Sequence, residues 1–250
     1  MRPIRTMEPL NKRRYELDHH VHVDPHRRAS ALADVILGGQ DGLVNVLGVI
    51  LGVAAATGDA RIVLAAGMAA TFAESVSMGA VAYTSTLAES AVYESERARE
   101  YRHVQAVPEL ERQEIRTIYH QKGFEGELLD RIVDTITTNR DVWVAVMMAE
   151  EHRLAPVDRR TALNSALIVG FSAVVGSLIP LAPFVFLPVY TSMWVSILVA
   201  GLMLFIVGAY KARVTVGRPG KSGLEMTLIG IASALVGFGV GLLFKVPAAG

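Results

Sequence analysis

The chain contains no cysteine, which removes two common ways of holding a protein together. Structural disulfides are excluded, and so are metal sites built from thiolate ligands. No signal peptide is expected, because residues 1–30 are polar and lack an apolar core segment. Strand-like alternation, internal repeats, phosphate loops, nucleophile arrangements and nucleic-acid motifs are also missing, which sets those classes of protein aside.

Charge is scarce over long parts of the chain. Charged residues make up only 19% of the 250 residues, while 52% are hydrophobic, whereas soluble domains are about 25% charged. Nearly all of the charge lies in residues 1–30, 89–160 and 211–225. A membrane-spanning helix needs about 20 mostly apolar residues, and five stretches are long enough. We therefore expect spans at 32–56, 62–88, 162–187, 189–210 and 224–246.

The distribution of Lys and Arg predicts the orientation of these spans. Both are frequent in the N-terminal tail, in the insert between spans two and three, and in residues 211–221. The connections 57–61 and 181–191 carry only Arg61 between them. Because cytoplasmic loops are enriched in positive charge, we expect the N-terminus and the insert inside and the C-terminus outside. The expected domains are a cytoplasmic tail (1–30), membrane helices (31–90), a cytoplasmic helical metal-binding domain (91–160) and membrane helices (161–250).

The insert is expected to be helical. No proline interrupts residues 61–104, so the second span should continue as a helix of about 65 Å, longer than the bilayer core of about 30 Å. Pro108 can open a second helix that ends near Gly123, and a third should follow Gly126 and continue through residues 142–149. The predicted fold is therefore an all-α membrane protein with five transmembrane helices and a three-helix cytoplasmic domain between helices two and three.

Three pairs of glycines four residues apart predict close contacts between the membrane helices. They are Gly38 with Gly42, Gly48 with Gly52, and Gly237 with Gly241.

Two carboxylates lie well inside the expected spans, where an ionisable group costs at least about 2.5 kcal/mol, while Asp34 and Glu225 lie nearer the span ends. Asp41 lies near the middle of the first span, and Glu74 lies in the second span one helical turn before Met78. Carboxylate oxygen suits Mn²⁺ and Fe²⁺, and a thioether favours softer ions over Mg²⁺. Together the three side chains predict a path for a transition metal. The alternative is structural, with Asp41 bonding a neighbouring backbone and Met78 filling space.

The insert carries a second group of candidate ligands. They occur in closely spaced sets, one set on each expected helix: Glu100 and His103, then Glu111 and Glu114, then Met147, Glu150 and Glu151. The E-x-x-H spacing of the first set is the repeated unit of di-iron sites, but a single copy does not imply a complete oxidase site. The alternative is a set of solvated glutamates paired with arginines. The histidines at 19, 20, 22 and 26 offer a loose metal-scavenging segment or an unstructured tail.

These residues, taken together, resemble the vacuolar iron transporter family over roughly residues 30–246. The resemblance rests on Asp41-Gly42-Leu43, Ser77-Met78, Glu111-x-x-Glu114-x-x-x-Ile118-Tyr119, and Met147-Met148-x-x-Glu151. It implies a dimeric exchanger of Fe²⁺ for protons, with Asp41 and Met78 in the pathway. It also implies a cytoplasmic site containing Glu100, Glu111, Glu114, Met147 and Glu151. His103 stands where the family has glutamate, and Val81-Ala82 replaces a Gly-Glu pair, so Glu74 is a candidate replacement carboxylate.

The resulting expectation is a transporter, not an enzyme. It would move Fe²⁺, with Mn²⁺ or other divalent transition metals as further substrates, out of the cytosol in exchange for protons. Its partners would be the lipid bilayer and a second copy of the chain, with no nucleic acid. A prokaryotic plasma membrane is preferred over a vacuolar one. The competing hypothesis is a membrane-anchored iron sensor or ferroxidase that does not transport.

Overall fold

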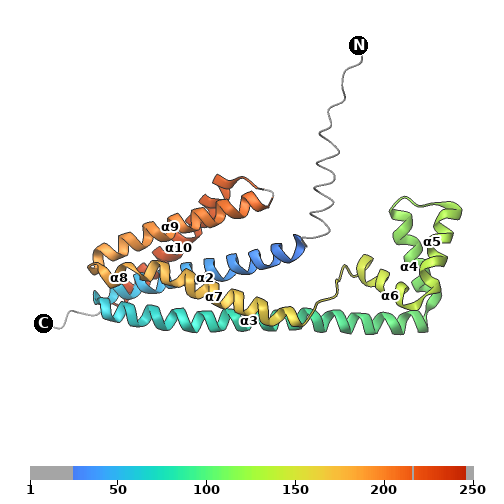
Figure 1. Ribbon diagram of the computed structural model, residues 1–250, viewed down its shortest axis with the longest axis horizontal. Helices are drawn as coiled ribbons and strands as arrows, with labels where there is room; N and C mark the ends of the chain where they lie inside the picture. The colour runs from blue at the N-terminus through green and yellow to red at the C-terminus, as the bar shows by residue number, and fades with distance from the viewer. Residues whose placement is uncertain (1–24, 216, 246–250) are drawn as a thin grey trace, which may run out of the picture. The chain divides into compact units, whose positions relative to one another are not determined.

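A computed structural model describes residues 25–215 and 217–245 of the chain. Helices α2 to α10 run through this part of the chain, and no strand occurs in it (Figure 1). Their bounds are α2 Pro25–Thr57, α3 Ala60–Ala106, α4 Pro108–Gln121, α5 Gly126–Thr138, α6 Arg140–Glu150, α7 Arg160–Leu181, α8 Pro183–Phe186, α9 Val189–Val214 and α10 Pro219–Leu243. The expected tail at 1–30 lies largely outside the described residues, and α2 begins within it.

Five of these helices are long and apolar enough to cross a membrane, which confirms the predicted number of spans among the described residues. They cover Ala31–Thr57, Ala60–Ala106, Arg160–Leu181, Val189–Val214 and Pro219–Leu243. The second is one uninterrupted helix of 47 residues, as the lack of proline in it predicts. The third ends earlier than expected, because Pro183 has no backbone N–H with which to continue the helix and instead begins the separate short helix α8.

The chain divides into two compact units. One unit, here called the membrane unit, comprises Met1–Val81 and Asn164–Gly250, and the other, the insert unit, comprises Ala82–Leu163. Helix α3 contributes its first part to the membrane unit and its last part to the insert unit.

In the membrane unit, α10 packs along both α2 and α9 (Figure 1). A Cβ atom at Gly237 or Gly241 would overlap the carbonyl oxygen of Gly48 or Gly52, so these two helices meet at their backbones. The first glycine pair of α2 meets α7 in the same way, because Gly38 and Gly42 face the backbone of Val169 and Ala173. The glycine spacings therefore mark real helix contacts, as small residues do in membranes.

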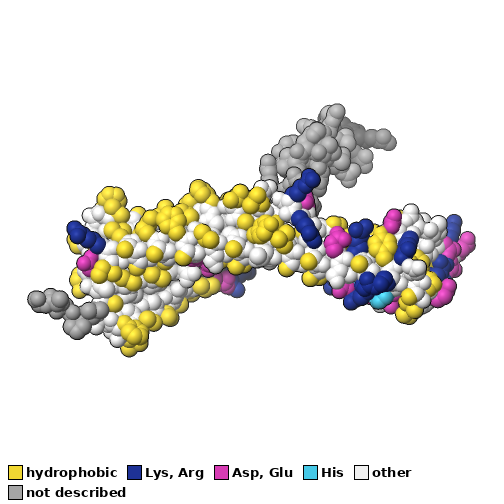
Figure 2. Space-filling model, turned by 90° about the horizontal axis from the view of Figure 1, so that it is seen from below, with side chains coloured by type: hydrophobic (Ala, Val, Ile, Leu, Met, Phe, Trp, Pro, Cys, Tyr) yellow, Lys and Arg dark blue, Asp and Glu magenta, His cyan; other side chains and the backbone are white. Residues whose placement is uncertain are grey.

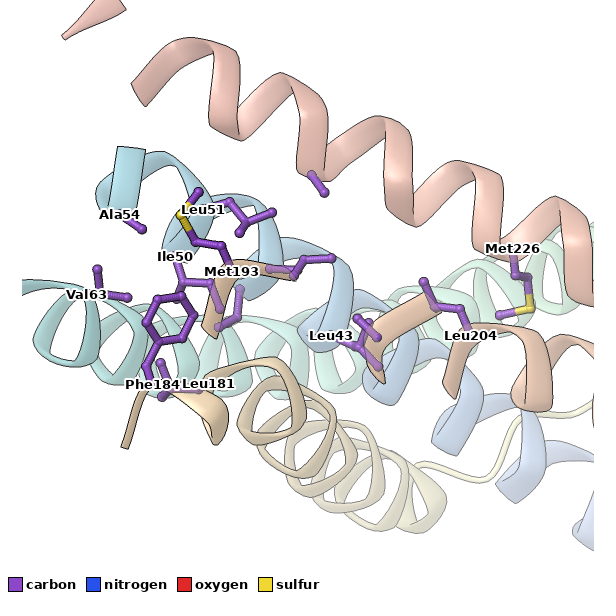
Figure 3. Close-up of a cluster of buried hydrophobic side chains, with 14 residues drawn as sticks. Leu43, Ile50, Leu51, Ala54, Val63, Leu181, Phe184, Met193, Leu204 and Met226 are labelled. Carbon is purple, nitrogen blue, oxygen red and sulfur yellow. The ribbon is translucent and has the colours of Figure 1, made fainter. Parts of the chain in front are cut away.

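Larger side chains fill the space that the close contacts leave. Ile50, Leu51, Val63, Phe184 and Met193 gather between the ends of α2, α3 and α9 and the short α8 (Figure 3). The outward faces of the same helices expose many hydrophobic side chains, among them Phe171, Phe186, Trp194 and Leu198. Figure 2 shows hydrophobic side chains spread over one face of these helices. Such a surface suits a lipid environment.

The insert unit has a core of its own. Leu129, Val133 and Ile136 form the buried stripe of α5, packed with Trp143 and Val144 of α6. The neighbouring Leu128 is 51% exposed, because only one side of α5 is covered.

The third insert helix proves to be two helices. The chain bends at Asn139, whose backbone is extended and whose side chain accepts hydrogen bonds from the backbone nitrogens of Asp141 at 2.9 Å and Val142 at 3.3 Å. Asparagine is a favoured N-cap because it satisfies free backbone donors at a helix start. The insert unit thus contains α4, α5 and α6 in addition to the end of α3, which is one helix more than the three-helix prediction.

Candidate metal sites

In the membrane unit, the structure brings together the two carboxylates predicted within the spans. Asn45, one turn after Asp41 on α2, donates a hydrogen bond from Nδ2 to Glu74 Oε1 at 2.9 Å. The Asp41 carboxyl lies close enough to Glu74 for the two charges to interact. Both carboxylates are half-buried, as is Met78 one turn further along α3. Oxygen ligands from two helices thus lie next to each other in a largely apolar setting.

In the insert unit, a denser cluster joins α3 and α4. Glu100 and Glu111 are among the least exposed residues of the chain, at 2% and 3%. His103 Nδ1 lies 3.7 Å from Glu100 Oε1 and 3.4 Å from Glu111 Oε1. One ligand atom from each of the three residues lies within 4.8 Å of the other two. This spacing could hold a cation, since donors bound to one ion at about 2.1 Å stand about 3–4 Å apart.

Each of the two buried carboxylates has one oxygen that the protein leaves without a partner. Oxygen Oε2 of Glu100 and Oε2 of Glu111 are both buried without a hydrogen-bond partner. A buried polar atom without a partner costs about 1–3 kcal/mol, and more when the group is charged. Neither oxygen has a Lys or Arg partner among the ion pairs of the described residues. These two oxygens therefore lack the neighbouring positive charge that a bound cation would supply.

Burial and neighbouring negative charges also raise the proton affinity of the cluster. Burial raises the pKa of Glu111 to about 7, and the charges of Glu100, Glu114 and Glu151 add to this shift. Burial likewise raises the pKa of Glu151, with Glu114 the next cause. Four of the predicted ligands, from α3, α4 and the end of α6, therefore interact electrostatically. Shifts of this kind, caused by desolvation and like charge, are common at functional sites.

Two further predicted ligands lie elsewhere in the insert unit. Met147 is fully buried within the hydrophobic core, among side chains such as Val133 and Ile115. Glu150 forms an ion pair with Lys122, with Oε2 and Nζ 2.5 Å apart. In this structure Glu150 has a cationic partner of its own, unlike the carboxylates of the cluster.

One residue of the cluster escaped the sequence analysis. His152 follows the predicted ligand Glu151, and its Nε2 lies 3.0 Å from Glu100 Oε1. It completes a second group with Glu100 and Glu151 whose ligand atoms lie within 4.8 Å of one another. The available signal was its adjacency to Glu151, which is weak because neighbouring residues on a helix point in different directions.

Comparisons with known proteins point to one family. A family profile described as the VIT family matches residues 32–242. The chain is 33% identical over 224 residues to a protein named vacuolar iron transporter 1 from Oryza sativa subsp. japonica, covering 89% of both chains. It is 34% identical over 221 residues to vacuolar iron transporter 1 from Arabidopsis thaliana, covering 87% of this chain and 88% of the relative. A vacuolar iron transporter from Plasmodium falciparum is 29% identical over 224 residues, covering 86% and 82%.

Proposed function

This chain belongs to the VIT family, a family of membrane transporters, and on that premise we propose that it carries Fe²⁺ out of the cytosol in exchange for protons. The observation that carries the proposal is the pair of buried carboxylates, Glu100 and Glu111, each with an oxygen that has no partner. With His103 they form a group of suitable size and charge to capture a divalent ion.

In the proposed pathway, the insert unit collects the ion and Asp41 and Glu74 carry it through the membrane unit. Met78 adds a soft ligand that favours Fe²⁺ over Mg²⁺. Protons and metal compete for the same carboxylate oxygens, so binding of one displaces the other. This competition gives a physical basis for exchange, and it also allows Mn²⁺, which prefers carboxylate ligands, as a second substrate.

The proposed orientation places the N-terminus and the insert unit in the cytosol. It follows from the excess of Lys and Arg in the tail, the insert and residues 211–221. The relatives named above are vacuolar by name, which gives no support to the preference for a prokaryotic plasma membrane. The family resemblance further leads us to propose a homodimer, which a mass measurement in detergent would test.

The direct test is Fe²⁺ uptake into proteoliposomes that contain the full-length protein and an internal fluorescent chelator. We expect uptake that increases when a pH gradient is imposed. Asp41→Asn should reduce flux to that of empty liposomes, because the neutral amide removes the mid-span charge. The matched control is Asp34→Asn, which makes the same change on the same helix but nearer its N-terminal end. This variant should retain flux, because Asp34 lies outside the proposed pathway.

Two outcomes would count against this function. Normal flux in Asp41→Asn would rule out the proposed pathway. No flux in the unchanged protein, together with intact folding and tight Fe²⁺ binding, would favour the sensor hypothesis, and oxygen-dependent formation of Fe³⁺ would favour the ferroxidase. The family comparisons favour neither alternative.

A further inference from the structure

His152 lies beside the acidic cluster of the insert unit, but it has no role in the proposed transport pathway. Its side chain is 16% exposed, and its Nε2 lies 3.0 Å from Glu100 Oε1 and 4.0 Å from Glu151 Oε2. The imidazole is therefore turned into the acidic cluster rather than toward solvent. Neutral imidazole is the commonest nitrogen ligand for metals in proteins.

The backbone around His152 holds it in this direction. After α6, the backbone nitrogens of Glu151 and His152 both donate to the carbonyl oxygen of Met147, at 3.0 and 3.3 Å. The next residue, Arg153, has a φ of 55°, the left-handed region that residues other than glycine seldom occupy. The nitrogen of Leu154 then donates to Met148 at 2.9 Å, which anchors the turn on the core of the unit. The turn at Arg153 thus ends the helix without carrying His152 away from Glu100.

Glu100 is shared by two groups of ligands. One group contains His103 and Glu111, and the other contains Glu151 and His152. Each group therefore has one imidazole and two carboxylates, with the buried Glu100 common to both. The spare oxygen of Glu100 and the spare oxygen of Glu111 are the unsatisfied atoms at the centre of this arrangement.

We propose that His152 is a metal ligand and that, with His103, it sets which divalent cations the cluster accepts. An imidazole on each side of Glu100 favours Zn²⁺, Co²⁺ and Fe²⁺ over Mn²⁺ and Mg²⁺, which prefer sites made of oxygen alone. The inference rests on the capture site of the proposed function and adds a cation preference to it. The competing explanation is that His152 only donates a hydrogen bond that satisfies one oxygen of Glu100.

Glutamine at position 152 separates these two explanations. Its amide can still donate a hydrogen bond to Glu100, but it is a poor ligand for Zn²⁺. The experiment compares the full-length protein in detergent micelles with His152→Gln and with the control His120→Gln. His120 is an exposed histidine near the end of α4 and belongs to neither ligand group. Zn²⁺ and Mn²⁺ affinities are measured by competition with a chromophoric chelator, and bound Co²⁺ is followed by its visible absorption.

We expect His152→Gln to weaken Zn²⁺ binding by about tenfold or more while Mn²⁺ binding changes much less. The Co²⁺ bands should also weaken and shift as a nitrogen donor is lost, and His120→Gln should match the unchanged protein. Equal losses for Zn²⁺ and Mn²⁺, or no loss for either, would overturn the assignment of His152 as a ligand. If the unchanged protein binds neither cation, the capture site itself fails. If the unchanged protein binds both cations and His152→Gln has the same ratio of Zn²⁺ to Mn²⁺ affinity, the role of His152 is rejected while the capture site stands.

Discussion

The helices of the membrane unit meet at their backbones, whereas those of the insert unit meet through large side chains and ion pairs. Gly237 and Gly241 of α10 touch Gly48 and Gly52 of α2 with no room for a methyl group. In the insert unit, α4 and α5 are joined instead by the ion pairs Arg112–Asp134 and Arg116–Asp130 above the buried core.

The difference follows from what surrounds each kind of helix. In a bilayer, burying an apolar side chain between helices gains little, because lipid is as apolar as leucine, and close van der Waals contact becomes the main source of attraction. In water, removing apolar area from solvent contributes about 25 cal/mol per Å² and dominates folding. The membrane unit should therefore be most sensitive to added volume, and the insert unit to changes in charge and capping.

The largest expected effect is that of a large residue in the α2–α10 contact. Gly241→Leu should destabilise the membrane unit by about 3 kcal/mol or more, because the new side chain must push the backbone of Gly52 away. Size-exclusion chromatography and thermal unfolding in detergent would measure the loss. Gly239→Leu is the matched control, since a Cβ there meets nothing within 4 Å. Equal behaviour of the two variants would show that backbone contact does not hold this unit together.

A smaller effect is expected from removing a buried charge in the insert unit. The pKa of Glu111 is raised from 4.5 to about 7, so the folded state binds this proton more tightly than the unfolded state does. The stability gained from this tighter proton binding is therefore fully present below pH 4.5, and it is lost as the pH rises through about 7. Without metal, Glu111→Gln should raise stability at pH 8 by on the order of 1–3 kcal/mol, and the gain should disappear at pH 4.5.

Fluorescence of Trp143, which is buried in the insert core, can report this unfolding with chelator present and Trp194 replaced by phenylalanine. A gain that is the same at both pH values would mean that Glu111 is not held in an unfavourable charged state. Added Zn²⁺ should reverse the order and leave the unchanged protein the more stable one, because the cation supplies the missing charge.

The smallest effect is expected at the start of α6. Asn139→Ala should cost about 1 kcal/mol, because the backbone nitrogens of Asp141 and Val142 lose their acceptor. Asn139→Asp keeps an acceptor at the same place and should be close to neutral. The same Trp143 fluorescence measures both variants. A similar loss in the two would assign the role of Asn139 to its backbone shape rather than to its side chain.

The sequence was sufficient to predict the apolar spans and the continuous α3, because each depends on local composition. The break at Asn139 was also readable, since asparagine before a helical run is an N-cap signal, but the apolar run through residues 142–149 concealed it. The glycine spacings predicted close contacts but not their partners, because which helices pair is decided by the whole bundle. Only the structure shows that Gly48 and Gly52 meet α10.

The candidate sites divide in a similar way. Glu100 and Glu111 stand in recognisable spacings, so their types were enough to suggest a metal cluster. His152 was missed because its direction depends on the left-handed turn at Arg153, a conformation that glycine or asparagine usually signals and arginine does not. Glu150 was grouped with Glu151 as a neighbour, yet it points to Lys122. Side-chain direction at a helix end is set by the turn that follows, which local sequence encodes poorly.

Helix α2 is in backbone contact with α7 through Gly38 and Gly42 and with α10 through Gly48 and Gly52. Rotation of α2 about its own axis would break its backbone contacts with both of these helices. Asp41 lies within the first of these contacts, between Gly38 and Gly42, so the packing of α2 against α7 sets its direction. In the proposed pathway, we therefore expect α2 to move together with α7 and α10 rather than to turn between them.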